Sequence, residues 1–380
     1  MKKIAVLGNG VTAKAVKAYI LRSKFFEEVN VKDADCIVTS PGIPPLGWPK
    51  ASVEIISDIE FVFRIFKRKN ISPKLIGITG TNGKTTVASA LAHVLGIPAY
   101  GNIGVPLIND IDSFNNRSII ILELSSFQLK SSPTLICDIA VITNITEDHI
   151  DWHQSFEQYE QTKLSILKRQ DQTVIIPKKY QLELKTVFQK NYNIEDLVGT
   201  HQWFSEKHNQ KNMEIVEKVG QELGISKEKI SQKISTFELP PFRCQVIQKG
   251  KEITIINDSK STNMGSTLAA VNSYENVEML ILAGQPKSIF SDEWSAQIDK
   301  KCKTILLAGE LANKQEFFPE LLKPKLKLFP TLKLATEFAL NELKNGLILF
   351  SPGAASFDEF ENYIARGKAF NEYVSKFKTN

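Results

Sequence analysis

The segment Gly80-Thr81-Asn82-Gly83-Lys84-Thr85-Thr86 has the residue types of a phosphate-binding loop. Its glycines let backbone N–H groups turn toward a phosphate, and the start of a following helix adds the positive end of its dipole. Lys84 is placed to reach the outer phosphates, and Thr85 to ligate Mg²⁺. The general phosphate-loop pattern GxxxxGK[ST] would place its first glycine at position 78, where this chain has Ile78. The strand and helix expected on either side nevertheless favour a nucleoside triphosphate site, and no NKxD motif follows to indicate guanine.

Acidic residues follow two later apolar runs. Glu123 stands near the end of the first run, where a carboxylate could help to hold Mg²⁺. A glutamate at a strand end is more often solvated or caps a helix, so both interpretations stay open for it. His149 follows the second run within an acidic cluster, unlike an isolated core histidine. His149 and His153 are four residues apart, which would suit zinc, but no pattern for a third ligand is evident.

The elements that must position these residues are short β-branched runs, each followed by turn residues and then a stretch typical of a helix. The runs are 3–8, 36–42, 74–80, 118–125, 139–145, 173–177, 252–257, 278–284, 304–309 and 346–353. Strands that alternate with helices predict an α/β fold with mostly parallel sheets. In such sheets ligands bind beyond the carboxyl ends of the strands, where the polar residues described above stand.

Two breaks in the pattern suggest domain boundaries. Residues 67–73 form a basic stretch with Asn, Ser and Pro before a fresh strand, and residues 239–241 read Leu-Pro-Pro after a helical stretch. Proline disfavours helix in the residue before it. Together with the usual domain size, these breaks predict three domains, at 1–72, 73–239 and 240–380.

Composition excludes several classes of protein. The 380 residues include 47 Lys and Arg against 42 Asp and Glu, a net charge of +5 that is too weak for a typical nucleic-acid binder. Four cysteines without a CxxC pair argue against a zinc ribbon or dithiol site and favour reduced thiols. No apolar run approaches the ~20 residues of a membrane helix. We therefore expect a cytoplasmic protein that binds neither membranes nor nucleic acid and that handles small acidic ligands.

Six segments taken together resemble the Mur ligase family, the ATP-dependent amide-forming enzymes of peptidoglycan precursor synthesis. These segments are 80–86, 101–104, 123–128, 143–151, 257–267 and 351–360. Asn257–Asn263 and Ser351–Phe360 look like signatures of the D-glutamate-adding branch, and the Asp-Asn-Pro-Arg motif of a neighbouring branch is absent. The resemblance implies a Rossmann-like N-terminal domain, a central P-loop ATPase-type parallel sheet and a Rossmann-like C-terminal domain.

The resemblance also implies the activity. ATP would phosphorylate the free carboxylate of UDP-N-acetylmuramoyl-L-alanine, and the amine of D-glutamate would displace phosphate from the acyl phosphate. Metal ions and cationic side chains would have to neutralise the anionic groups that meet. ATP, two Mg²⁺ ions and a carbamylated lysine are the implied cofactors. The partners would be these small molecules, and we expect a monomer.

By the same resemblance, Lys84 and Thr85 hold the triphosphate and one Mg²⁺, and Glu123 completes that metal site. His149 would bind the second Mg²⁺. Lys163 falls at the family's carbamylated lysine, where a carbamate supplies an anionic oxygen ligand. Without the resemblance, Lys163 reads as a solvated helix lysine. Lys260 is expected near the phosphates or the attacking amine, and Lys84, His149, Lys163 and Lys260 are the implied catalytic residues.

Further contacts are implied on both sides of the reaction. His208 and Asn209 resemble the family's adenine-contacting pair, with Asn209 binding ATP. Arg243 and Asp258 would meet the nucleotide from the last domain. The implied contacts to the acceptor and to D-glutamate are Asn102, Ser125, Thr262, Lys287, Ser356, Phe357 and Tyr363.

The first domain departs most from the family. Residues 8–13 read GxGxxA, compatible with a diphosphate turn, but no clear acidic ribose partner follows at a strand end, so a NAD site is disfavoured. By resemblance, Val11, Thr12 and Gly42 would approach the UDP part. The domain is short, and the second strand of the family is expected to be deleted near 27–31. The central domain is shortened between Lys163 and His208.

Two alternatives remain at this stage. A folylpolyglutamate synthetase-like enzyme also adds glutamate to a carboxylate and needs no UDP site, although the two branch signatures oppose it. A non-catalytic descendant would bind nucleotide without turnover, although it would need few of the retained lysines. Turnover of ATP with acceptor and D-glutamate separates both from the leading interpretation.

Overall fold

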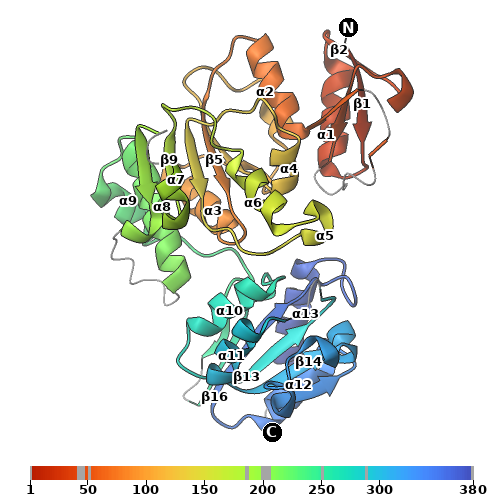
Figure 1. Cartoon of the computed structure of the whole chain (residues 1–380), viewed down its shortest axis with the longest axis vertical. Helices are drawn as coiled ribbons and strands as arrows, with labels where there is room; N and C mark the ends of the chain where they lie inside the picture. Colours follow the sequence, from red (N-terminus) through yellow and green to blue (C-terminus); the bar gives the residue numbers. More distant parts are fainter. Residues whose placement is uncertain are drawn as a thin grey trace. The chain divides into compact units, whose positions relative to one another are not determined.

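The computed structural model confirms an α/β architecture with three sheets, which Figure 1 traces from red to blue along the chain. It describes residues 2–40, 48–49, 53–184, 188–197, 207–249, 252–286 and 290–377. Two predicted site residues, Gly42 and Lys287, lie outside the described residues.

The first sheet is parallel and has the order β2-β1-β3-β4. Its strands are β1 (Lys2–Leu7), β2 (Phe26–Glu28), β3 (Cys36–Thr39) and β4 (Glu54–Ser57). Helix α1 (Val11–Arg22) follows β1 and buries Val16 and Ile20, while β4 passes directly into α2 (Asp58–Arg68). Ser57 caps α2 by accepting a hydrogen bond from the Glu60 N–H at 3.0 Å.

The strand expected to be deleted near 27–31 is present, so that part of the prediction was wrong. Residues Phe26–Glu28 pair in parallel with Lys2–Ile4 as β2. The strand is only three residues long and two of them are glutamates, and its pairing partner is β1. A short strand is therefore present where a deletion was expected.

The second sheet is also parallel, with the order β10-β9-β8-β5-β7-β6. Its strands are β5 (Lys74–Thr79), β6 (Ala99–Gly101), β7 (Ile119–Glu123), β8 (Ile139–Ile142), β9 (Thr173–Ile176) and β10 (Lys190–Asn193). The interior strands are nearly continuous apolar runs, as expected for strands covered on both faces.

The helices that accompany this sheet are α3 (Lys84–Leu95), α4 (Ser126–Lys130), α5 (Ile150–His153), α6 (Phe156–Leu164), α7 (Lys178–Leu184), α8 (Lys207–Glu222) and α9 (Lys227–Ile234). Two of them start directly after strand ends that carry expected site residues. Helix α3 follows β5 and the phosphate-loop segment, and α4 follows β7 and Glu123. The sheet thus brings these segments to one edge, at the carboxyl ends of adjacent strands.

The third sheet has the order β11-β12-β16-β13-β14-β15. Its strands are β11 (Gln245–Lys249), β12 (Ile253–Asn257), β13 (Val277–Ala283), β14 (Cys302–Ala308), β15 (Leu326–Phe329) and β16 (Gly346–Gly353), and only the β11–β12 pair among these strands is antiparallel. Helices α10 (Met264–Asn272), α11 (Asp292–Lys301), α12 (Leu332–Glu342) and α13 (Tyr363–Lys376) complete this part.

The chain forms two compact units. The first contains residues 1–203 and 209–237 and holds the first two sheets, and the second contains residues 204–208 and 238–380 and holds the third. The division into domains at 72/73 and 239/240 remains a prediction. Within the described ranges, no helix has both the length and the apolar character needed to span a bilayer.

Burial of Asp58 makes stability depend on pH. The side chain is 5% exposed, and desolvation raises its pKa to about 6 although Gln128 donates a hydrogen bond to it. A carboxyl whose pKa rises on folding takes up a proton on folding, so the free energy of unfolding falls as pH rises from about 4 to 6. The difference corresponds to about 3 kcal/mol above pH 6.

We therefore expect Asp58→Asn to remove a loss of about 2 kcal/mol between pH 4.5 and 7, because an amide stays neutral and its oxygen still accepts from Gln128. Denaturant unfolding of both proteins at pH 4.5 and 7 measures the change. Equal losses of stability between the two pH values in both proteins would contradict the assignment.

Candidate active site

The phosphate-loop segment connects β5 to α3, as its pattern predicts. Gly80 has φ +141° and Gly83 has φ +84°, backbone conformations that favour glycine. The Thr81 N–H donates to the Asn144 carbonyl at 2.8 Å, and the Asn82 N–H donates to Asn144 Oδ1 at 3.0 Å. The loop is therefore held in shape by the residues that follow β8.

Two lysines meet at the carbonyl oxygen of Gly80. Lys84 Nζ donates to this oxygen at 2.8 Å and to the Thr81 carbonyl at the same distance. Lys163 Nζ, from α6, donates to the Gly80 carbonyl at 2.7 Å. The side chain of Lys163 is 1% exposed, and burial, with a smaller effect of the Lys84 charge, lowers its pKa well below the usual range. Lys163 is thus not a solvated helix lysine.

Glu123 lies at the carboxyl end of β7 and is 1% exposed. Its Oε1 accepts a hydrogen bond from Asn102 Nδ2 at 2.9 Å. Its Oε2 is buried and has no hydrogen-bond partner among the described residues. A buried carboxylate oxygen without a donor is costly, and a Mg²⁺ ion would satisfy it. The donor set therefore fits the metal expected here.

His149 sits in a strained backbone conformation at the start of α5. Its φ is +54°, which is uncommon for a side chain other than glycine and costs of order 1–3 kcal/mol. The His149 N–H donates to Asp148 Oδ1 at 2.9 Å, and its Nε2 lies 3.7 Å from Asp148 Oδ2. The ring packs edge-on against Phe127, with 4.9 Å between ring centroids. These contacts fix the imidazole while leaving it about one-third exposed.

His153 is engaged elsewhere. It is buried, and its Nε2 is 2.9 Å from Ser126 Oγ, at the first residue of α4. Across the residues that the structure describes, no three or more His, Cys, Asp or Glu side chains are grouped as a metal cluster would require. The His149–His153 spacing therefore gains no support as a zinc site.

Ser125 forms a capping box with Gln128 at the start of α4. Ser125 Oγ accepts from the Gln128 N–H and donates to Gln128 Oε1, and Gln128 Oε1 also accepts from the Ser125 N–H. This arrangement fixes the helix immediately after Glu123. The substrate contact expected of Ser125 remains a prediction.

Helix α8 approaches the phosphate loop. Asn209 is 2% exposed and Asn212, one turn later, is 7% exposed. A Cβ atom added at Gly83 would lie 2.6 Å from Asn212 Oδ1, so this amide borders the loop. Thr85 and Thr86 follow Gly83 on α3, with Thr85 half-buried and Thr86 buried. The adenine contact expected of Asn209 stays a prediction.

In the second unit, Asp258 follows β12 and is held by three donors. Ser261 Oγ and Ser351 Oγ both donate to its Oδ2, the latter at 2.8 Å, and the Cys244 N–H donates to its Oδ1 at 3.1 Å. Burial raises its pKa to about 6, although the neighbouring hydrogen bonds and the charge of Arg243 oppose the shift. Arg243 is half-buried within the same unit.

The remaining predicted residues of the second unit lie around the carboxyl ends of its strands. Lys260 Nζ stands 4.4 Å from the centroid of the Tyr363 ring. Ser356 is 2% exposed, whereas Phe357 is 71% exposed, an unusual fraction for a large apolar side chain. Thr262 is half-buried.

The turn after β1 is open. Gly8 has φ +103°, and a Cβ atom added at Gly10 would meet no atom within 4 Å. Val11 is 73% exposed and Thr12 half-buried at the start of α1. Beside the turn, the Ser40 N–H donates to the Leu7 carbonyl at 3.2 Å, and the buried Ser40 Oγ has no partner within the described ranges.

Three residues of these sites were missed by sequence reasoning. Tyr159 on α6 is buried, its hydroxyl is 3.0 Å from Thr81 Oγ1, and its ring lies 4.7 Å from Lys163 Nζ. Arg366 on α13 is buried and donates to the Ala283, Ala354 and Ser259 carbonyls. Asn212 had one signal, its spacing of one helical turn from Asn209.

Gly80→Ala is expected to abolish ATP binding, raising its Kd by about 100-fold or more. The added Cβ atom would lie 2.0 Å from Thr143 Oγ1, at a φ that L side chains rarely adopt. Gly96→Ala at the other end of α3 is the matched control, because Gly96 also has positive φ but open space around it. It should cost about 1 kcal/mol of stability and leave binding intact. Calorimetric titration with ATP checks both, and equal affinities would contradict the loop assignment.

Comparison with known proteins gives one family match. Residues 78–225 match the Mur ligase middle domain, which covers the phosphate loop, Glu123, His149, Lys163 and Asn209.

Curated relatives match nearly the whole chain. A UDP-N-acetylmuramoylalanine–D-glutamate ligase of Hydrogenobaculum sp. (strain Y04AAS1) is 34% identical, covering 97% of this chain and 95% of the relative. One of Prochlorococcus marinus (strain MIT 9312) is 33% identical, covering 93% of this chain and 85% of the relative. Among solved structures, the MurF ligase of Thermotoga maritima in complex with ADP superimposes with a TM-score of 0.66 at 14% identity, covering 99% of this chain and 95% of that one.

Proposed function

The chain belongs to the Mur ligase family, alongside the UDP-N-acetylmuramoylalanine–D-glutamate ligases, and from this premise we propose that it joins D-glutamate to UDP-N-acetylmuramoyl-L-alanine at the expense of ATP. The product is a precursor of peptidoglycan, made in the cytoplasm by a monomeric enzyme. The observation that carries the proposal is the convergence of Lys84 and Lys163 on the Gly80 carbonyl, within electrostatic reach of Glu123.

The reaction proceeds in two steps. A carboxylate oxygen of the alanyl group attacks the γ-phosphorus of ATP, so an acyl phosphate forms and ADP leaves. The amine of D-glutamate then attacks the acyl carbon, the C–O bond to phosphate breaks, and the amine loses a proton. The protein contributes mainly position and charge, because the reacting groups are anionic and repel one another.

In the first step, Lys84 serves the triphosphate. Its ammonium group donates to the Gly80 and Thr81 carbonyls, so it is held at the loop that is proposed to bind the phosphates. The N-terminus of α3 directs further N–H groups to the same place.

Thr85, Glu123 and His149 are the residues proposed to hold two Mg²⁺ ions, with a carbamate on Lys163 as a further ligand. Bound Mg²⁺ neutralises the phosphate oxygens and polarises the transferred group. Support comes from the Oε2 of Glu123, which has no partner among the described residues, and from the packing of the His149 ring against Phe127.

Lys163 is suited to carbamylation. Burial favours its neutral amine, whose lone pair attacks CO₂ to form an N–C bond with release of a proton. The resulting anion would replace a buried amine by a metal ligand within electrostatic reach of Lys84 and Glu123, whose charges already act on Lys163.

The second unit is proposed to bind D-glutamate. The proposed contacts to the amino acid are Thr262, Lys287, Ser356, Phe357 and Tyr363. Lys260 is proposed to lie near the phosphates or the attacking amine. Arg243 and Asp258 contact the nucleotide. The high exposure of Phe357 supports a role in contacting a ligand. Val11, Thr12 and Gly42 are proposed to contact the UDP part, and the first two lie at the start of α1 beside the first sheet.

Phosphate release from Mg-ATP with UDP-N-acetylmuramoyl-L-alanine tests the proposal. D-glutamate, L-glutamate and no amino acid are compared in parallel. Release that requires D-glutamate is expected. Equal release with L-glutamate would favour a folylpolyglutamate synthetase-like activity, and ATP binding without release would favour a non-catalytic protein; either result overturns the proposal.

A further inference from the structure

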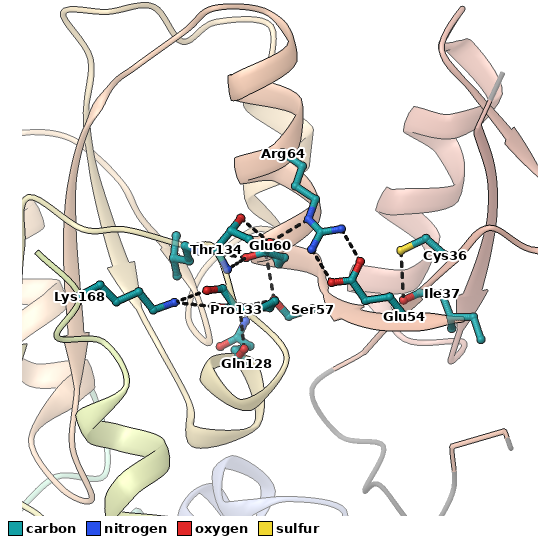
Figure 2. Close-up of polar contacts among 12 residues, drawn as sticks. Cys36, Ile37, Glu54, Ser57, Glu60, Arg64, Gln128, Pro133, Thr134 and Lys168 are labelled. Carbon is teal, nitrogen blue, oxygen red and sulfur yellow. Dashed lines mark hydrogen bonds and ion pairs between the residues drawn. The ribbon is translucent and has the colours of Figure 1, made fainter. Parts of the chain in front are cut away.

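Arg64 on α2 joins two carboxylates that belong to different parts of the first unit. Its two terminal nitrogens donate to the two oxygens of Glu54 at 2.6 and 2.7 Å, a bidentate pair on edge strand β4. Its Nε donates to Glu60 Oε1 at 2.8 Å. Figure 2 shows the guanidinium group between these two glutamates.

Glu60 in turn holds the loop that follows α4. Its side chain is 0% exposed, and it accepts from the Thr134 N–H, Thr134 Oγ1 and the Leu135 N–H at 2.7 to 3.1 Å. A buried carboxylate with this many donors is fixed in one orientation. On the other side of the loop, Lys168 donates to the Ser132 and Pro133 carbonyls.

The junction between β4 and α2 is fastened to the same loop. The Ser57 N–H donates to the Ser131 carbonyl at 2.8 Å, and Ser57 Oγ is 2.6 Å from Ser132 Oγ. Gln128 Nε2 donates to Asp58 Oδ1 at 3.3 Å. Because Gln128 also closes the capping box with Ser125, these contacts lead along α4 to the residue two positions beyond Glu123.

We propose that Arg64 is a positioning residue for the nucleotide-sugar substrate: it fixes edge strand β4 to α2 and, through Glu60, to the loop that follows α4, and thereby sets where the acceptor carboxylate reaches the site at Glu123. The inference rests on the proposed function, in which the first sheet binds the UDP part. The substrate is proposed to be bound at both ends, its UDP part at the first sheet and its carboxylate at the site by Glu123. Both contacts form together only when the distance between them is fixed, so loss of the connection weakens binding of the whole substrate.

The inference predicts a selective kinetic effect. Arg64→Ala should raise the KM for UDP-N-acetylmuramoyl-L-alanine about 10-fold or more and leave the KM values for ATP and D-glutamate within about 2-fold. Arg64→Lys should give a KM between those of the wild type and Arg64→Ala, since lysine keeps the charge but cannot make the bidentate hydrogen bonds to Glu54 while it also bonds Glu60. If Arg64 acts through Glu54, adding Glu54→Ala to Arg64→Ala should change the KM no further.

Arg169→Ala is the matched control. Arg169 pairs with Asp138 at 3.0 Å and is similarly half-exposed, but both residues belong to the second sheet's surroundings rather than the first sheet. It should leave the KM for the nucleotide-sugar unchanged. Thermal unfolding of every variant verifies that the comparison is made on folded protein.

Calorimetric titration of each variant with UDP-N-acetylmuramoyl-L-alanine separates the inference from the proposed function. Wild-type turnover with D-glutamate, combined with equal acceptor affinity in wild type and Arg64→Ala, would overturn the inference and leave the function standing. A parallel rise of all three KM values would also overturn it, because that is the signature of a general structural defect. A wild type that neither binds nor uses the acceptor would overturn both.

Discussion

Glu123→Gln is expected to lower kcat/KM for phosphate release by about 10²- to 10³-fold, the usual cost of losing one preorganised electrostatic contact. Glutamine preserves the shape of the side chain and keeps an oxygen to accept from Asn102. It removes the negative charge at Oε2, the buried atom that has no partner among the described residues. The remaining activity should need a higher concentration of Mg²⁺, because the site has lost its carboxylate ligand.

Glu157→Gln is the control for charge alone. Glu157 is exposed on α6 in the same part of the molecule, so its loss changes net charge equally without touching the metal site. Steady-state phosphate release across a Mg²⁺ titration gives both results. An unchanged Mg²⁺ dependence in Glu123→Gln would show that this carboxylate is not a ligand.

Lys163→Met is expected to abolish measurable turnover, a loss of about 10³-fold or more, because it removes both the bond to Gly80 and the site of carbamylation. In the wild type, activity should fall in CO₂-depleted buffer and return with bicarbonate. Incubation with ¹³C-bicarbonate should give a carbamate carbon signal by NMR that is missing from Lys163→Met.

Lys179→Met is the matched control for this test. Lys179 lies on α7 and its side chain is 54% exposed. Its Nζ is 3.5 Å from Oε1 of Glu160, which lies on α6 as Lys163 does. This variant should keep its activity and its ¹³C signal. Wild-type activity that is indifferent to bicarbonate, with no carbamate signal, would leave Lys163 acting as an amine and refute the proposed modification.

Sequence reasoning found the interior strands and missed the edges. The ten predicted runs correspond to β1, β3, β5, β7, β8, β9, β12, β13, β14 and β16, which are the interior strands of the three sheets as described. The strands that it missed, β2, β4, β6, β10, β11 and β15, each lie at a sheet edge. Interior strands are covered on both faces and read as apolar runs, whereas edge strands here are three to five residues long and carry polar residues such as those of Lys190–Asn193.

The residues of the candidate site likewise fall into those that the local sequence indicates and those that it does not. The phosphate loop was predictable because its chemistry lies within seven consecutive residues between a strand and a helix. Tyr159 and Arg366 were not, because they act through packing with residues 78 and 107 positions away. The Tyr159 hydroxyl contacts Thr81, and the Arg366 guanidinium contacts carbonyls at or just after strand ends. Neither contact is indicated by the residues next to Tyr159 or Arg366 in the sequence. The roles of Lys163 and His149 came from the family resemblance rather than from their own surroundings in the sequence.

The hydrogen bonds between Glu60 on α2 and the loop after α4 also bear on the order in which the chain folds during synthesis. The first sheet is complete once residue 57 has been made, and domains generally fold from the N-terminus as the chain emerges. Glu60 receives its bonds from Thr134 and Leu135 only some 75 residues later. Until then the Glu60 carboxylate and the N-terminal end of α2 are exposed to water on the nascent chain. The first sheet can therefore form before the second sheet has been synthesised, and the loop after α4 must dock onto an α2 helix that is already folded.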